Sequence, residues 1–290
     1  MSQKIKLVEC SRDAMQGLHD FIPTALKAQY INLLLQVGFD TIDFGSFVSP
    51  KAIPQLRDTA EVLGQLELSN THSKLLAIVA NLRGVEEAVK HQAITYLGFP
   101  FSISETFQQR NTNSSITQSL NTVEEMLNLC DKNHKIAVVY LSMGFGNPYG
   151  DEWNVEIVEK WAYELVNRGV KILSLADTTG VSTPEKIAFI LPELIKKFNQ
   201  TEIGIHLHST PTTRIEKMEA AYLAGCKRFD SALKGFGGCP MATDDLTGNM
   251  ATEDLIYYLT SKGELLNLNM EKWNEAMLLS STVFNGKLNI

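Results

Sequence analysis

Two histidines spaced two residues apart, His206 and His208, are the side chains of this chain best suited to binding a metal ion. In a β-strand, residues i and i+2 point to the same face, so both imidazoles can reach one ion. An isolated pair can equally be two polar residues where a strand ends. Asp13 and Asn249 would add a carboxylate and an amide oxygen if the fold brings them to the same place. Such a mixed nitrogen and oxygen set favours an octahedral Mg²⁺ or Mn²⁺ ion over a tetrahedral structural Zn²⁺.

Arg12 and Cys239 are two further residues that could take part in chemistry. An arginine beside an aspartate is commonly a plain ion pair at a strand end, but it can also direct a fixed cation toward a developing oxyanion. Cys239 lies in the segment 235–240, GFGGCP, where a glycine-rich loop could present a reactive thiol, although buried cysteines are usually inert. The remaining cysteines keep that structural interpretation: Cys10, Cys130 and Cys226.

The elements that must position these residues follow a repeating pattern. Eight short apolar runs occur at 5–10, 41–47, 75–80, 94–101, 136–143, 170–177, 202–209 and 228–233. Each is followed by a helical pattern, near 23–37, 53–63, 85–91, 116–131, 155–168, 184–198, 214–224 and 252–262, and a final one covers 270–284. Apolar runs without strict polar alternation are typical of strands buried on both faces of a parallel sheet.

Eight such units predict one α/β domain, a single (β/α)₈ TIM barrel over residues 1–265 with a C-terminal helical extension over 266–290. An open doubly wound sheet is the alternative, but no GxGxxG segment follows the first run. Barrel enzymes carry their chemistry at the carboxyl ends of the strands. The unusual polar residues fall at those ends or in the loops that follow: Arg12, Asp13, Asp43, Glu105, Asp177, His206, His208, Cys239 and Asn249.

The composition excludes several classes of protein. The formal charge of −7, from 26 Lys+Arg and 33 Asp+Glu, lacks the basic excess of a nucleic-acid binder. No apolar run approaches the ~18–20 residues of a membrane span. The strand-like segment 5–9 leaves no room for a signal or transit peptide, and no cysteine pair has CxxC spacing. We therefore expect a cytoplasmic protein with a small-molecule ligand, and neither nucleic acid nor membrane as partner.

Several motifs together resemble one enzyme family. Residues 12–16, RDAMQ, resemble the RDxxQ segment that opens 3-hydroxy-3-methylglutaryl-CoA lyases, members of the DRE-TIM metallolyase superfamily. Further matches run in order along nearly the whole chain: SFVSPKAIPQ (46–55), ISETFQQRN (103–111), ADTTGVSTP (176–184), HLH (206–208), GFGGCP (235–240) and GNMATEDL (248–255). SFVSPK and GxGGCP are specific to the lyase, whereas RD and HxH are shared with the superfamily's condensing enzymes.

The resemblance implies a metal-dependent cleavage of an acyl-CoA, 3-hydroxy-3-methylglutaryl-CoA, to acetyl-CoA and acetoacetate, a reaction of leucine degradation, by a homodimer. The implied metal ligands are Asp13, His206, His208 and Asn249. Arg12 would stabilise the enolate, Cys239 would transfer a proton, and His206 is the candidate base with Asp43 or Asp177 as alternatives. The expected substrate-binding residues are Arg12, Gln16, Ser46, Lys51 and Glu105.

The chain also departs from the family pattern. Cys10-Ser11 replaces the usual Gly-Pro, Asp43 replaces a glutamate, and Ser209 replaces an aspartate. The segment 239–249 is one residue longer than usual and carries Asp244 and Asp245. These departures leave three alternatives: a lyase or aldolase acting on another acyl-CoA or keto acid, a Claisen-type condensing enzyme, and a non-catalytic barrel that binds a metal or ligand.

Overall fold

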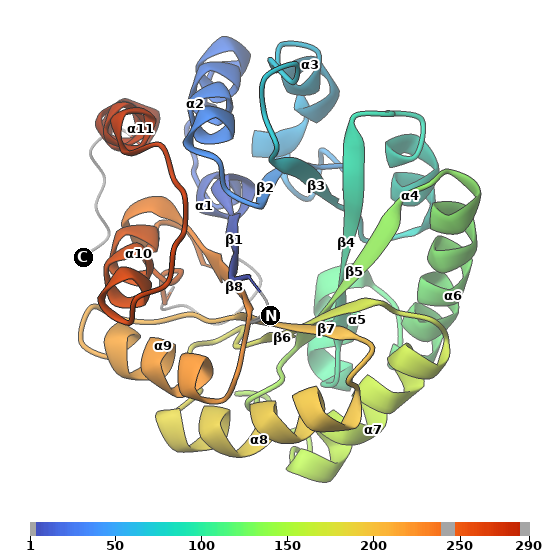
Figure 1. The fold of residues 1–290 in the computed structure, drawn as a ribbon. Coiled ribbons are helices and arrows are strands. Elements are labelled where there is room, and N and C mark those ends of the chain that lie inside the picture. Colours follow the sequence, from blue (N-terminus) through green and yellow to red (C-terminus); the bar gives the residue numbers. More distant parts are fainter. Residues whose placement is uncertain (1–3, 239–246, 285–290) are drawn as a thin grey trace.

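Eight parallel strands close into a barrel whose order around the ring is the order along the chain (Figure 1). The computed structural model describes residues 4–238 and 247–284 of the 290. The strands are β1 (Lys6–Glu9), β2 (Thr41–Ser46), β3 (Lys74–Ile78), β4 (Ile94–Ser102), β5 (Ile136–Ser142), β6 (Ile172–Ala176), β7 (Glu202–His206) and β8 (Arg228–Ser231). The predicted (β/α)₈ architecture is confirmed.

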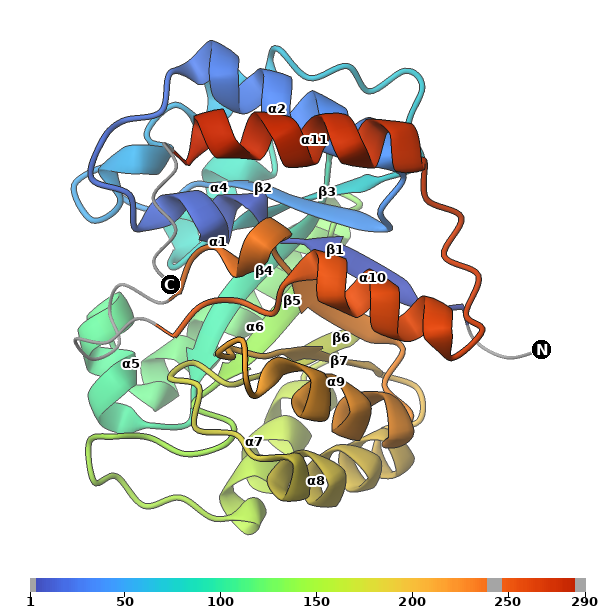
Figure 2. The same cartoon turned by 90° about the vertical axis from the view of Figure 1, so that its left-hand side faces the viewer.

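Most helices surround the strands on the outside of the ring, and two short ones lie at one end of the barrel (Figures 1 and 2). They are α1 (Ser11–Gln16), α2 (Thr24–Val37), α3 (Thr59–Leu63), α4 (Leu82–Ala88), α5 (Glu105–Thr112), α6 (Ile116–Lys132), α7 (Val155–Asn167), α8 (Pro184–Lys197), α9 (Arg214–Leu223), α10 (Thr252–Ser261) and α11 (Met270–Val283), with 3₁₀ turns η1 (Pro54–Leu56) and η2 (Leu233–Gly235). One core fills the space between strands and helices, and a smaller one fills the barrel lumen.

The single helix predicted over 53–63 is wrong, because η1 and α3 are separate elements. The ammonium of Lys27 on α2 donates to the Asp58 carboxylate at 2.7 Å and also to the Gln55 carbonyl. In a continuous helix the Gln55 carbonyl would accept a hydrogen bond from a backbone N–H. Here it accepts one from the Lys27 side chain instead. The apolar residues of 53–63 keep their helical spacing, but the bonds of the buried Lys27 divide the segment into η1 and α3.

Two short rim helices, α1 and α5, have no apolar stripe long enough for the sequence to indicate them. Polar bonds hold α5 instead: Ser104 caps it by accepting from the Phe107 N–H, at 3.1 Å. The Asp151 carboxylate accepts from the backbone N–H and hydroxyl of Thr106, at 2.9 and 2.8 Å. Both helices lie at the end of the barrel opposite the N-terminus (Figure 2).

The C-terminal helix α11 packs on α2, as Figures 1 and 2 both show. The rings of Phe39 and Trp273 meet at 6.2 Å, and those of Tyr30 and Phe284 at 5.9 Å. The extension thus completes the barrel's outer layer, while its boundary at residue 265 stays a prediction. Within the described ranges, no helix is long and apolar enough to cross a membrane.

Candidate active site

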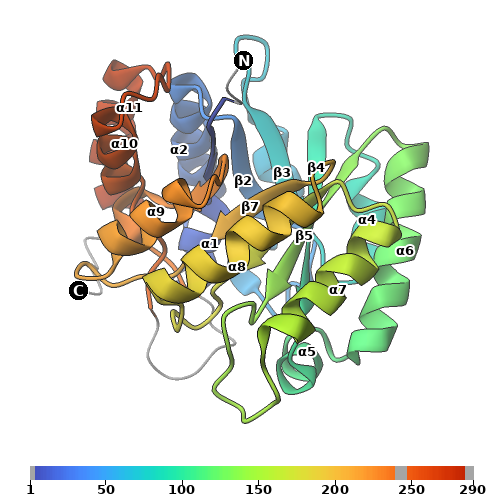
Figure 3. The ribbon, with the colours of Figure 1, turned by 60° about the horizontal axis from the view of Figure 1, so that its bottom comes forward.

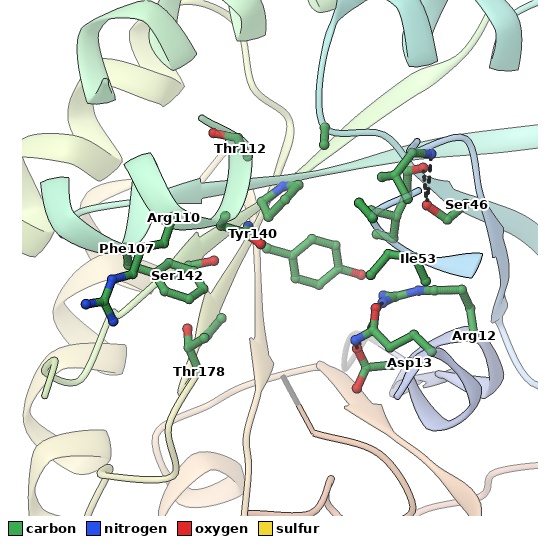
Figure 4. Close-up of a pocket in the computed structure, with 18 of the residues that line it drawn as sticks. Arg12, Asp13, Ser46, Ile53, Phe107, Arg110, Thr112, Tyr140, Ser142 and Thr178 are labelled. Carbon is green, nitrogen blue, oxygen red and sulfur yellow. Dashed lines mark hydrogen bonds and ion pairs between the residues drawn. The ribbon is translucent and has the colours of Figure 1, made fainter. Parts of the chain in front are cut away.

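Arg12 lies on α1, directly after β1, beside Asp13 (Figure 4), and its guanidinium binds the carboxylates of Asp13 and Asp43. Its Nε and Nη2 donate to Asp43 Oδ2, at 3.0 and 2.6 Å. Its Nη1 donates to Asp13 Oδ1 and Gln16 Oε1, both at 2.9 Å. Of the five guanidinium N–H groups, these bonds leave one, on Nη2, without a partner among the described residues. Burial alone would lower the pKa of Arg12, but the carboxylates of Asp43 and Asp13 raise it overall.

Asp43, on β2, is fully buried and directs both carboxylate oxygens at Arg12. Burial raises its pKa to about 6, against the opposing effect of the Arg12 charge. A carboxylate engaged in this way fixes the orientation of the guanidinium. Its position supports a role in holding Arg12.

Asp13, His206 and His208 each offer a ligand atom, and these atoms lie within 4.8 Å of one another. The two Nε2 atoms of the histidines are 3.2 Å apart. Burial, and then the nearby His206, lower the pKa of His208 to about 4, so its imidazole is neutral, the form that binds metal. Burial alone would raise the pKa of Asp13, but Arg12 first, and then the neighbouring histidines and the Asn249 hydrogen bond, lower it overall, which favours the carboxylate form. The donor set therefore fits a divalent ion.

Asn249 joins this group through an isolated antiparallel bridge with His208. Its Nδ2 donates to Asp13 Oδ2 at 2.6 Å and to the Phe236 carbonyl at 2.8 Å. Ligation through the amide oxygen requires the Asn249 side chain to turn over, which would release both bonds. The predicted four-ligand set is thus brought to one place, with Asn249 facing it by its nitrogen.

A cavity of about 440 Å³ opens onto these residues. Its wall includes Arg12, Asp13, Gln16, Ser46, Ile53, Phe107, Arg110, Tyr140, Ser142, Thr178, His206 and His208. Figure 4 shows the Tyr140 ring in the middle of the pocket, with Arg12 on one side and Phe107 on the other. The Tyr140 and His206 rings are 5.8 Å apart. Tyr140 lies in an apolar run whose sequence does not indicate a functional site. The register of β5 in the sheet determines that its side chain points into the lumen.

Five of the described predicted site residues do not line this cavity: Asp43 and Asn249, whose contacts are given above, and Lys51, Glu105 and Asp177. Lys51 is exposed on the loop after β2. Glu105 accepts a bond from the Ile116 backbone N–H at 3.1 Å. Asp177 is buried and accepts bonds from Ser182, through its N–H at 3.1 Å and its hydroxyl at 2.5 Å.

Lys217, on α9, is a buried residue that the sequence patterns do not indicate. Its Nζ donates to Asp177 Oδ2 at 3.1 Å, to the Gly180 carbonyl at 3.1 Å and to the His208 carbonyl at 2.9 Å. One ammonium therefore joins the loops that follow β6 and β7. Cys239, predicted to transfer a proton, lies outside the described residues.

Comparison with known proteins identifies relatives over nearly the whole chain. The family model described as HMGL-like matches residues 4–279. A hydroxymethylglutaryl-CoA lyase of Bacillus subtilis is 34% identical over 90% of this chain and 86% of its own length. A cytoplasmic 3-hydroxy-3-methylglutaryl-CoA lyase of Rattus norvegicus is 32% identical over 95% of this chain and 80% of its own.

Solved structures agree with these relatives. The HMG-CoA lyase of Bacillus subtilis has a TM-score of 0.92 at 32% identity, over 100% of this chain and 97% of that one. An HMG-CoA lyase of Acinetobacter baumannii, solved with coenzyme A and 3-methylmalate, has a TM-score of 0.90 at 28% identity, over 98% and 93%. Motifs, barrel and relatives coincide over the same residues, and the chain belongs to the HMGL-like family.

Proposed function

We propose that the chain is a metal-dependent carbon–carbon lyase that cleaves 3-hydroxy-3-methylglutaryl-CoA to acetyl-CoA and acetoacetate. The observation that carries this proposal is the convergence of Asp13, His206 and His208, with ligand atoms within 4.8 Å of one another, beside Arg12 on the wall of one cavity. The names of the relatives from Bacillus subtilis and Rattus norvegicus, and the coenzyme A in the Acinetobacter baumannii complex, support the acyl-CoA substrate.

Asp13, His206 and His208 would hold the ion, with Asn249 as a fourth ligand after its amide turns. Their oxygen and imidazole donors favour Mg²⁺ or Mn²⁺. A bound ion would acidify the substrate's tertiary hydroxyl and fix its geometry. Asp13, His206 and His208 share the cavity wall with Arg12 and Tyr140, which supports a site for such an ion there.

Arg12 would stabilise the enolate oxygen that develops on the thioester when the carbon–carbon bond breaks. Its unpartnered Nη2 hydrogen is the donor available for that oxygen, and Asp43 and Gln16 keep the guanidinium in place. A donor held in this way is worth about 3–4 kcal/mol of transition-state stabilisation. Holding it in advance avoids reorganisation during the reaction.

We propose further roles for the other predicted site residues. Gln16 and Ser46 line the cavity and can contact substrate. Lys51, exposed on the loop after β2, would meet the charged end of an acyl-CoA, whereas Glu105 would act through the segment whose Ile116 N–H it binds. Cys239 would protonate the enolate carbon. Asp177 would act through Lys217.

We also propose that the protein forms a homodimer and is located in the cytoplasm. The rat relative is named as cytoplasmic, whereas a lyase of Bos taurus, 32% identical to this chain, is named as mitochondrial.

The direct test is to incubate the purified protein with 3-hydroxy-3-methylglutaryl-CoA, with and without Mg²⁺, and to measure acetoacetate. We expect product only with the metal, and a loss of product in a His208→Ala variant that still folds. Cleavage of a different acyl-CoA alone would select the related lyase. Net condensation of acyl-CoA with a keto acid would select the condensing enzyme. Metal binding without turnover of any acyl-CoA would leave a ligand-binding barrel.

A further inference from the structure

His206 has a second partner below the metal site. Its Nδ1 lies 3.2 Å from Oδ2 of Asp230, a buried residue on β8. A carboxylate can only accept a hydrogen bond, so Nδ1 carries the hydrogen and Nε2 keeps its lone pair. That lone pair faces the same group as His208 and Asp13. The bond therefore selects the tautomer that metal ligation needs.

Strand register places a second charged residue one level deeper in the lumen. Ala176, His206 and Asp230 are paired across β6, β7 and β8, while Ser174, Gly204 and Arg228 are paired two residues earlier. A Cβ added to Gly204 would lie 2.9 Å from Arg228 Cδ, so the arginine side chain passes directly over this glycine. Arg228 is thus packed across the lumen beneath the His206 level.

The charge of Arg228 is balanced from two sides. Its Nη1 donates to Glu202 Oε1 at 3.2 Å, on the amino-terminal side of the barrel. Burial lowers the Arg228 pKa, but Asp230 first, and then Tyr140 and Glu202, raise it overall. The Asp230 carboxylate therefore lies close enough to Arg228 for the two charges to interact.

Several buried polar atoms at these two levels have no hydrogen-bond partner within the described part of the chain. They are Asp230 Oδ1, Ser174 Oγ, and Nε and Nη2 of Arg228. Buried polar groups are nearly always satisfied, and an orphaned one costs about 1–3 kcal/mol. Internal water, which typically makes about three hydrogen bonds, fits such a cluster of donors and acceptors.

We propose that Asp230 is a positioning residue that holds the metal ligand His206, and that Arg228 and Ser174 hold Asp230 through water in the lumen. This inference rests on the proposed metal site. With an ion on Nε2 and Asp230 on Nδ1, both ring nitrogens are occupied. His206 is then a ligand that Asp230 keeps in one orientation.

The thiol of Cys10 lies beside the same pair, with its sulfur within 4.8 Å of ligand atoms of His206 and Asp230. A second ion there would have to share the His206 ring with the first. Burial, followed by the charge of Asp230, raises the pKa of the Cys10 thiol well above its ordinary value. An ion between Cys10 and Asp230 would need the same His206 Nδ1 that donates to Asp230, so the geometry favours Asp230 as an orienting group over a separate metal site.

The test is an Asp230→Asn variant, with Asp58→Asn as the matched control. Asp58 is also a buried carboxylate in an ion pair, but its partner is Lys27 and not a metal ligand. Mn²⁺ affinity is measured from the electron paramagnetic resonance signal of the free ion, and folding from circular dichroism. Loss of a group that orients a ligand typically weakens metal binding about 10- to 100-fold. We expect that loss for Asp230→Asn, partial rescue by Asp230→Glu, and a Kd within about twofold of wild type for Asp58→Asn.

A folded Asp230→Asn protein with the wild-type Mn²⁺ affinity would overturn the inference. If that variant does not fold, ¹⁵N spectra of histidine-labelled wild-type protein decide, with the His206 signals assigned by their loss in His206→Gln. A protonated Nδ1 and an unprotonated Nε2 support the inference, and the opposite tautomer refutes it. Failure of the lyase assay in a wild-type protein that binds Mn²⁺ refutes the proposed function alone. Absence of Mn²⁺ binding in wild type refutes both.

Discussion

Glu9, the last residue of β1, is fully buried and links that strand to the segment after β8. Its carboxyl group accepts bonds from the Leu233 N–H at 2.9 Å and the Thr252 hydroxyl at 2.6 Å. Burial raises its pKa from 4.5 to about 8, although both bonds oppose this. We predict that Glu9→Gln removes a large part of the pH dependence of stability, because a glutamine cannot ionise.

The sign follows from a folded-state pKa above the unfolded one. The stabilisation is fully present below pH 4.5 and is lost as the pH rises toward 8. At about 1.4 kcal/mol per pH unit, the interval from 4.5 to about 8 corresponds to about 5 kcal/mol. Between pH 6 and pH 9 the part still to be lost is about 3 kcal/mol.

Urea unfolding at pH 6 and pH 9 measures this directly. The free energy of unfolding of wild type should fall by about 3 kcal/mol more than that of Glu9→Gln over this interval. Glu67→Gln, at an exposed glutamate, is the matched control and should follow wild type. Parallel pH profiles for wild type and Glu9→Gln, within about 1 kcal/mol, would refute the argument that Glu9 is protonated in the folded protein.

Three further changes test the catalytic roles. Asp13→Ala should leave less than about 1% of the metal-dependent turnover and weaken Mn²⁺ binding; turnover near wild type would end its assignment as a ligand. Arg12→Met should lower kcat about 10²- to 10³-fold with metal affinity little changed, and an unchanged kcat would contradict its enolate role. Cys239→Ser should lower kcat about 10²-fold or more while Mn²⁺ binding persists. Cys130→Ser, at a buried cysteine on α6, is its control, and equal kcat in the two variants would return Cys239 to a structural role.

The barrel can be predicted from the sequence because a parallel strand is buried on both faces and is therefore a short run of apolar residues. The run 136–143 illustrates both the strength and the limit of that signal. It predicts β5, but nothing in it distinguishes Tyr140 as a site residue, although the Tyr140 ring lies in the middle of the pocket (Figure 4). Whether a residue faces the lumen or the helices depends on register across the sheet, which one strand alone does not contain.

The short rim elements follow a different rule. The helix predicted over 53–63 fails at Asp58 because a lysine distant in sequence binds the chain there. Helix α5 forms on a polar sequence because Asp151, in another loop, bonds Ser104 and Thr106 at its start. Figure 3 shows α5 at the end of the barrel away from the N-terminus, apart from the helices that line its sides. Contacts between residues far apart in the sequence determine where these short helices begin and end. The spacing of apolar residues within one segment does not indicate such contacts.

A position at the carboxyl end of a strand shows that a side chain can reach the site, but not which of its atoms remain available. Asp177 and Asp13 both follow strands at this rim. The Asp177 carboxylate is engaged by Ser182 and Lys217. The Asp13 carboxylate also accepts bonds, from Arg12 and Asn249, yet its ligand atom lies within 4.8 Å of the ligand atoms of two imidazoles. A carboxylate and two imidazoles gathered this closely are stabilised by a cation, so we expect the proposed metal ion to bind at this group, and not at Asp177, and to stabilise the fold when it binds.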